Sequence, residues 1–275
     1  SFFYSDVREC KLYNLFFGSN DIKTKSLNYS FSVNDNIPTI QTLNLETSLI
    51  ELKENTQANL TLKATYSDGT IKDITNNIQW SIQDNSIVSI TNTTLKALKE
   101  GTTTLSATVD NTTSNRINIT VYKEINGYKL PPQPDPTINN STLLGIDSNN
   151  NGVRDDVERK IINKYKAEPI KIEVQMSAVK VFQEILENPI GNAEVLQKKL
   201  SRNIDCVMYL KYQQNIKIPD RIKFIENTTY NTKQRVKAYL QYNQALSGGV
   251  YGGPRSNYNA QACDFDVEQM LEDRK

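Results

Sequence analysis

The chain has 275 residues, of which 37% are hydrophobic and 23% are charged, and its formal net charge is +1. This composition predicts a folded protein of two or three domains, and it lacks the basic balance that is typical of nucleic-acid-binding proteins. Histidine is absent, which excludes Ser-His-Asp and Cys-His catalysis as well as zinc sites that need imidazole ligands.

No apolar run is long enough to cross a bilayer as a helix, so we expect no transmembrane segment in this sequence. The sequence starts at Ser1 rather than Met, which favours a trimmed chain. Residues 1–36 give no clear domain signature. Residues 11–17 and 27–33 are candidate strands, the second because apolar and polar side chains alternate along it.

Residues 37–125 have the pattern of an all-β domain. Apolar and polar residues alternate in several short runs, most clearly from Leu60 to Tyr66, as expected for strands with one buried face. Turn signals separate these runs, and Gly69 in the SDGT turn can adopt a positive φ. Several strands at this spacing predict a β-sandwich.

Four segments of this domain, TYSDGTIKDIT, IQWSI, LKALKEGTTTLSATV and INITV, follow one another along the chain. In these segments and their order, residues 38–123 resemble a bacterial Ig-like domain of group 2. The resemblance implies an Ig-like β-sandwich without paired core cysteines, used as a stalk or spacer in surface adhesins and secreted bacterial proteins. We expect Trp80 to pack in the core between two sheets, and the alternative is a ligand-binding aromatic.

Residues 126–141 are predicted to form a linker. Prolines at positions 131, 132, 134 and 136 favour an extended polyproline II conformation and argue against a helix. A spacer is the favoured interpretation, and a proline-rich ligand for a partner domain is the alternative.

Residues 142–275 are predicted to contain a metal-binding loop followed by a small all-α domain. From Asp155 onwards, apolar residues recur with a helical period. The pattern predicts helices starting at residue 155, over 172–186 and 193–212, from residue 219, and over 232–246 and 265–271. Gly248 and Gly249 are expected to close the helix that precedes them.

The segment DSNNNGVRDDVE, residues 147–158, matches the EF-hand loop pattern D-x-[DN]-x-[DN]-G-x5-E. In such a loop, side-chain oxygens and one backbone carbonyl bind Ca²⁺, while Gly152 permits the sharp turn at the sixth position. The last residue binds with both carboxylate oxygens from the first turn of the following helix. The predicted ligands are Asp147, Asn149, Asn151, Val153 (through its carbonyl), Asp155 and Glu158.

The loop departs from a full EF-hand because prolines and NNSTLLGI stand where the entering helix would be, and no second loop accompanies it. It resembles the single loops of dockerin-type or thrombospondin-type repeats, which argues against a calmodulin-like opening switch. With three charged ligands, we expect a dissociation constant of roughly 0.1 to 1 mM or somewhat tighter, as in extracellular modules. The alternative is an Asn-rich turn in which Asp155 caps the next helix.

The cysteines stand at positions 10, 206 and 263, and none belongs to a CxxC pair. We predict a disulfide between Cys206 and Cys263, since both lie in the C-terminal region, and three separate thiols are the alternative. Cys10 is then free or paired with another chain.

Three pairs of carboxylates raise the alternative of a hydrolase that uses paired acids: Asp155 with Asp156, Glu184 with Glu187, and Asp264 with Asp266. The glycine-rich segment 247–253 lacks the Lys-Ser/Thr step of a phosphate loop. Seven tyrosines are either half-buried core residues or a binding surface: Tyr209, Tyr212, Tyr230, Tyr239, Tyr242, Tyr251 and Tyr258.

The favoured interpretation is a non-enzymatic, calcium-binding bacterial protein that is secreted, periplasmic or at the cell surface. The Ig-like module would project the helical domain toward a protein or glycan partner, in adhesion or another interaction. Ca²⁺ would brace the junction between the linker and the helical domain. The alternatives are a carboxylate-dependent hydrolase in the helical domain and a structural envelope lipoprotein.

Overall fold

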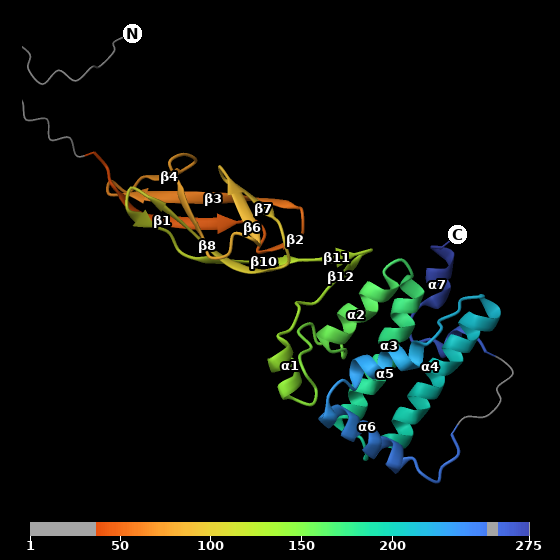
Figure 1. Cartoon of the computed structure of the whole chain (residues 1–275). Coiled ribbons are helices and arrows are strands. Elements are labelled where there is room, and N and C mark those ends of the chain that lie inside the picture. The colour runs from red at the N-terminus through yellow and green to blue at the C-terminus, as the bar shows by residue number, and fades with distance from the viewer. Residues whose placement is uncertain (1–36, 252–257, 275) are drawn as a thin grey trace, which may run out of the picture.

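The computed structural model describes residues 37–251 and 258–274. Along this part of the chain, strands come first and helices follow (Figure 1), which confirms the predicted combination of a β region and an α region. The predictions for residues 1–36, which include Cys10 and the candidate strands 11–17 and 27–33, lie outside the described residues, as do Gly252 and Gly253.

The β region contains two five-stranded sheets. In the first sheet the strands run in the order β1-β3-β7-β6, with β4 also paired to β3, and all pairs are antiparallel. Its strands are β1 (Ile40–Thr47), β3 (Gln57–Tyr66), β4 (Ile71–Asp73), β6 (Val88–Thr91) and β7 (Thr94–Ala97).

The second sheet has the order β2-β10-β8-β5, with β9 also paired to β8. Its pairs are antiparallel except for β2 and β10, which run parallel. Its strands are β2 (Glu51–Lys53), β5 (Gln79–Ile82), β8 (Gly101–Val109), β9 (Thr112–Thr113) and β10 (Ile117–Tyr122).

The two sheets share one hydrophobic core because each long strand alternates between buried and exposed side chains. In β3, Ala58, Leu60, Leu62 and Ala64 are buried, and every second residue of β8 is buried from Thr103 onwards. Side chains from both sheets belong to the same cluster, so the predicted β-sandwich is confirmed. Trp80 packs against this cluster while half-buried, and its Nε1 donates a hydrogen bond to the carbonyl of Asn92 at 2.9 Å.

The segment predicted as an extended linker contains local structure. β11 (Glu124–Ile125) and β12 (Tyr128–Lys129) form a small hairpin, and α1 (Pro136–Ser141) follows it. A helix is possible here because Pro136 occupies the first helical turn. Backbone N–H groups in that turn have no acceptor within the helix, so the missing N–H of proline costs no hydrogen bond. The side chain of Asp135 caps this turn by accepting from the backbone N–H groups of Thr137 and Ile138.

The α region is built around one central helix. That helix, α3, contacts five other helices, and its buried residues recur along most of its length. The helices are α2 (Asp155–Tyr165), α3 (Pro169–Glu187), α4 (Ala193–Gln213), α5 (Arg221–Thr229), α6 (Lys233–Ala245) and α7 (Val267–Glu272), with a 3₁₀ turn η1 (Ala260–Ala262). Each agrees with a helix that the apolar period predicts. Gly248, which follows the end of α6, has a φ of +89°.

A disulfide joins Cys206 of α4 to Cys263, which confirms the predicted pair. Both cysteines are buried in a small cluster that also holds Tyr209, Leu210 and Val267. The bond therefore fastens the C-terminal segment to α4. Within residues 37–251 and 258–274, no helix is both long and apolar enough to cross a membrane.

Candidate metal centre

The segment 147–158 forms a closed loop that leads directly into α2. The backbone N–H of Asp155 donates to the carbonyl of Ile146 at 2.8 Å, which brings the two ends of the loop together. Gly152 has a φ of +82°, a left-handed conformation that favours glycine. The sharp turn at this position is therefore present, as the loop pattern requires.

Asp147 holds the turn from inside the loop. Its Oδ2 accepts from the N–H of Gly152 at 2.8 Å, and its Oδ1 accepts from the N–H of Asn151 at 3.2 Å. The Oδ1 of Asn149 accepts from the same N–H at 3.1 Å. The side-chain oxygens of Asp147 and Asn149 therefore lie close together.

Glu158 reaches back from the first turn of α2 to the same loop. Its Oε2 accepts from the Nδ2 of Asn151 at 2.7 Å and from the Nδ2 of Asn149 at 3.2 Å. The Oδ1 of Asn151 accepts from the N–H of Val153 at 2.8 Å. The side chains of the predicted ligands at loop positions 3, 5 and 12 therefore meet at one place.

The two remaining predicted ligands differ in position. Val153 is fully buried beside the turn. The Oδ1 of Asp155 accepts from the N–H of Ser148 at 2.9 Å, so this carboxylate also binds the loop backbone. Asp155 is the first residue of α2, and the capping position belongs to Arg154, so the alternative in which Asp155 caps the helix is not the one observed.

Burial raises the pKa of Asp155 and of Glu158, and repulsion from neighbouring carboxylates, including Asp147, raises both further. A raised carboxyl pKa means that the surroundings disfavour the charged form. Hydrogen bonds from Ser148 to Asp155, and from Asn151 and Asn149 to Glu158, lower these pKa values and offset part of the effect. The loop thus concentrates negative charge that a bound cation would stabilise.

Two buried arginines lie behind the loop. The guanidinium of Arg154 donates to the carbonyls of Thr229 at 3.2 Å and Thr228 at 3.1 Å, and it pairs with Asp156 at 2.5 Å. The guanidinium of Arg235 donates to main-chain carbonyls of the segment before the loop, namely those of Asn139, Thr142 and Leu143. Together they tie the loop to the end of α5 and the segment before the loop to α6.

Charged groups of both signs lie in and beside the loop. Asp147, Asp155, Asp156 and Glu158 supply four carboxylates, whereas Arg154 and Arg235 supply two guanidinium groups. Burial, and then the neighbouring Arg154, lowers the pKa of Arg235 to about 10.

In the part of the chain that the structure describes, no three His, Cys, Asp or Glu side chains gather closely enough to hold a metal ion by themselves. A loop of this kind does not need such a group, because amide and main-chain oxygens supply three of its six predicted ligands. The amide groups of Asn149 and Asn151 now present nitrogen to Glu158. Rotation of each amide about its Cβ–Cγ bond would present oxygen instead.

One member of each carboxylate pair considered for hydrolysis has another partner. Glu184 forms an exposed ion pair with Lys199, while Asp156 pairs with Arg154. Asp266 caps α7 by accepting from the N–H of Gln269 at 3.0 Å. These acids hold helices and loops in place, and none of them lines the pocket described next.

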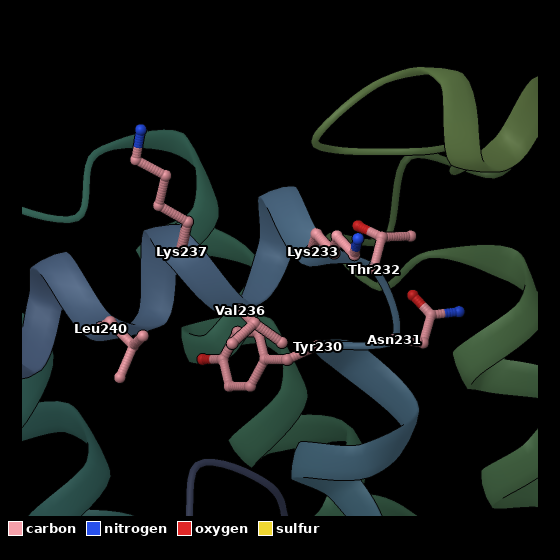
Figure 2. A pocket seen from close by; sticks show the side chains of 7 residues that line it. All are labelled: Tyr230, Asn231, Thr232, Lys233, Val236, Lys237 and Leu240. Atoms are coloured by element: carbon pink, nitrogen blue, oxygen red, sulfur yellow. The ribbon is translucent and has the colours of Figure 1, made fainter.

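A shallow pocket of about 440 Å³ lies along the start of α6. Figure 2 shows Tyr230 on its floor, with Val236 and Leu240 beside the ring and the Lys237 side chain directed away from it. Asn231, Thr232 and Lys233 complete the lining. The pocket carries no carboxylate, and the Oδ1 of its Asn231 accepts from the Nη2 of the loop residue Arg154 at 3.3 Å.

The tyrosines of the helical region mostly belong to its core. Tyr209, Tyr230 and Tyr242 are buried, and the rings of Tyr230 and Tyr239 stack with centroids 4.4 Å apart. Tyr212 and Tyr251 are the exposed members of the set, at 60% and 39%.

The sequence analysis did not single out Arg154 or Arg235, which hold the loop and the segment before it against α5 and α6. It also did not single out Arg159 and Glu100, which form an ion pair at 2.7 Å. Arg154 and Arg159 lie inside or directly after the motif, at positions that the pattern leaves free. Arginine side chains are mostly exposed in folded proteins, so nothing in the sequence indicated that these two are buried.

Compared with known protein families and with curated proteins, the sequence matches none. Among solved structures, part of the chain matches the crystal structure of the S-layer protein SbsC domains 4 and 5. The match has 16% sequence identity and a TM-score of 0.26, and it covers 30% of this chain and 53% of that chain. The chain thus spans about half the length of that structure, and so distant a match carries no information about function.

Proposed function

We propose that this chain is a non-enzymatic bacterial surface or secreted protein in which the loop 147–158 binds Ca²⁺. The ion would brace the junction between the linker and the helical domain. The helical domain would engage a protein or glycan partner, and the sandwich, which resembles bacterial Ig-like domains of group 2, would act as the spacer.

The convergence of loop side chains on Glu158 carries this proposal. Glu158 at position 12 accepts from the amides at positions 3 and 5, and Asp147 at position 1 accepts from the N–H of position 5. The glycine at position 6 has the required left-handed backbone. When Ca²⁺ is bound, it supplies the positive charge that these oxygens lack, and it accepts their number and flexible geometry. Magnesium, which demands a tighter octahedron, fits such a loop less well.

The disulfide supports an extracellular location. Disulfides persist in oxidising compartments and are rare in the reducing cytosol, and Cys206 and Cys263 form one here. An ion bound with a dissociation constant of roughly 0.1 to 1 mM would also be retained only where Ca²⁺ is abundant, as it is outside cells.

The bracing role follows from what the loop connects. Arg154 at position 8 donates to the end of α5, and the N–H of Asp155 closes the loop on Ile146. An ion that orders the loop would therefore order the start of α2 and the segment that leads into the helical core.

Calorimetric titration of the full chain with CaCl₂ and with MgCl₂ tests the proposal, together with melting in Ca²⁺ and in EDTA. We expect one Ca²⁺ per chain and weaker binding of Mg²⁺. At a hundredfold excess over the dissociation constant, Ca²⁺ should stabilise the fold by about 2.7 kcal/mol. Absence of binding heat, together with identical melting in Ca²⁺ and in EDTA, would contradict the proposal.

A further inference from the structure

Two neighbouring residues in the first turn of α2 face different parts of the molecule. Glu158 turns back to the loop, where its Oε2 accepts from Asn149 and Asn151. Arg159 follows it and turns toward the sandwich. Side chains of consecutive helical residues project about 100° apart, so one rigid turn presents both groups. A change in the position of this turn must therefore move both.

Arg159 joins three segments at once. Its Nη2 pairs with the Oε1 of Glu100 at 2.7 Å, and its Nη1 donates to the carbonyl of Pro131 at 2.6 Å. The N–H of Glu100 in turn donates to Glu54 at 2.9 Å. Glu100 precedes β8 at the turn after β7, while Pro131 belongs to the linker. Arg159 is 9% exposed, so this contact is largely shielded from solvent.

The other contacts across the junction divide into two groups. The hairpin β11–β12 is fixed to the helices, because Tyr128 donates to Glu173 at 2.9 Å and Leu130 packs in the helical core. The hairpin follows β10 after Lys123 alone. It meets the sandwich through two ion pairs, Lys53 with Glu124 and Lys129 with Glu51, and through the Nζ of Lys129, which lies 4.6 Å from the ring centre of Tyr122. Exposed pairs contribute little to stability. Among these ion pairs, the one between Arg159 and Glu100 is the most shielded from solvent.

We propose that the cation bound by the loop sets the orientation of the sandwich relative to the helical domain, through the ion pair of Arg159 with Glu100. The cation fixes Glu158, and with it the first turn of α2 from which Arg159 reaches the sandwich. This inference rests on the proposed calcium site. Arg159 is a positioning residue and does not bind the ion.

The test measures the distance between the two domains in the full chain. Nitroxide labels are attached at Lys72→Cys on β4 and Lys198→Cys on α4, both exposed, in a Cys10→Ser background that keeps the native disulfide. Double electron-electron resonance then gives the distance distribution in CaCl₂ and in EGTA. In the parent chain, we expect CaCl₂ to narrow the distribution to less than half its width in EGTA.

Arg159→Gln and Glu100→Gln each remove the ion pair, and the second keeps the test valid if the first does not fold. Both should give the broad distribution in CaCl₂ as well as in EGTA. Calcium affinity should fall by no more than about fivefold, because linkage is reciprocal and the pair is a modest one. Arg202→Gln, which alters an exposed arginine within the helical domain, should behave as the parent does.

The outcomes separate this inference from the calcium site itself. If calorimetry shows binding but CaCl₂ leaves the parent distribution unchanged, the inference fails and the calcium site stands. The inference would also fail if CaCl₂ narrowed the distance distribution of the Glu100→Gln variant as much as that of the parent chain. If calorimetry shows no binding, both proposals fail together.

Discussion

At the residue scale, the loop depends on side chains that are not among its predicted ligands. Arg154 and Arg235 are completely buried, and their guanidinium groups donate to the end of α5 and to the segment before the loop, respectively. A buried charge costs free energy unless it is paired and hydrogen-bonded. These two arginines therefore hold the backbone around the loop only as long as their acceptors stay in place.

Replacing Arg154 by Met tests this dependence. The carbonyls of Thr228 and Thr229 and the carboxylate of Asp156 would lose their donor, so we expect a loss of about 3 to 5 kcal/mol in the free energy of unfolding. Urea denaturation followed by circular dichroism measures the loss. The matched variant Arg202→Met, at an exposed arginine, should cost less than about 1 kcal/mol. Equal losses in the two variants would contradict the role given to Arg154.

Glu158→Gln removes the ligand at the last position of the loop without changing its size. We expect Ca²⁺ affinity to fall by about tenfold or more, because one charge and the bidentate contact are lost. Glu187→Gln, at an exposed position at the end of α3, should bind as the parent does. Calorimetric titration of both variants decides the point, and unchanged affinity in Glu158→Gln would remove Glu158 from the ligand set.

At the element scale, most secondary structure could be predicted because periodicity reports which side of each element is buried. The apolar period placed helices over 193–212 and 232–246, and the structure has them at Ala193–Gln213 and Lys233–Ala245. The short helix at Pro136 escaped prediction, since four nearby prolines suggested an extended chain. Its first-turn proline and Asp135 cap are local signals that could have found it.

The surroundings of the loop could not be predicted in the same way. The motif located the loop and its turn, because each position has a fixed chemical role. The contacts of Arg154 with Thr228 and of Arg235 with Asn139 join residues 74 and 96 positions apart. No local pattern encodes such pairs, which depend on how α5 and α6 pack against the loop.

The disulfide also acts at this scale, since it fastens the segment around η1 and α7 to α4. A double variant, Cys206→Ala with Cys263→Ala, should lose about 4 kcal/mol in the free energy of unfolding, because the 57-residue separation is no longer closed in the unfolded chain. Urea denaturation under oxidising conditions measures this. Cys10→Ala serves as the comparison, and we expect the double variant to be clearly the less stable of the two.

At the scale of the whole molecule, the sandwich and the helical region have separate hydrophobic cores. Separate cores allow separate unfolding transitions, because each can lose its packing while the other persists. Trp80 is the only tryptophan of the chain and packs on the sandwich core, whereas the helices dominate far-ultraviolet circular dichroism. The two signals therefore report on different halves of the protein.

Ca²⁺ should act unequally on these two transitions. At ten to a hundred times its dissociation constant, it should stabilise the helical transition by about 1.4 to 2.7 kcal/mol. The midpoint temperature of the transition followed by Trp80 fluorescence should rise much less, since the loop belongs to the helical domain. Thermal unfolding in CaCl₂ and in EDTA, recorded with both signals, provides the measurement. Equal shifts would mean that the molecule unfolds as one unit.

Gly145 lies between the two buried arginines, with a φ of +74°. A Cβ atom there would overlap Arg154 and come within 2.6 Å of Asn139 Oδ1 and 2.9 Å of an Arg235 nitrogen. Any larger residue would have to expel one guanidinium from the interior. We therefore expect a distant homologue with this architecture to keep a glycine and two arginines at the positions of Gly145, Arg154 and Arg235. These three residues together could identify such a homologue even when overall sequence identity is low.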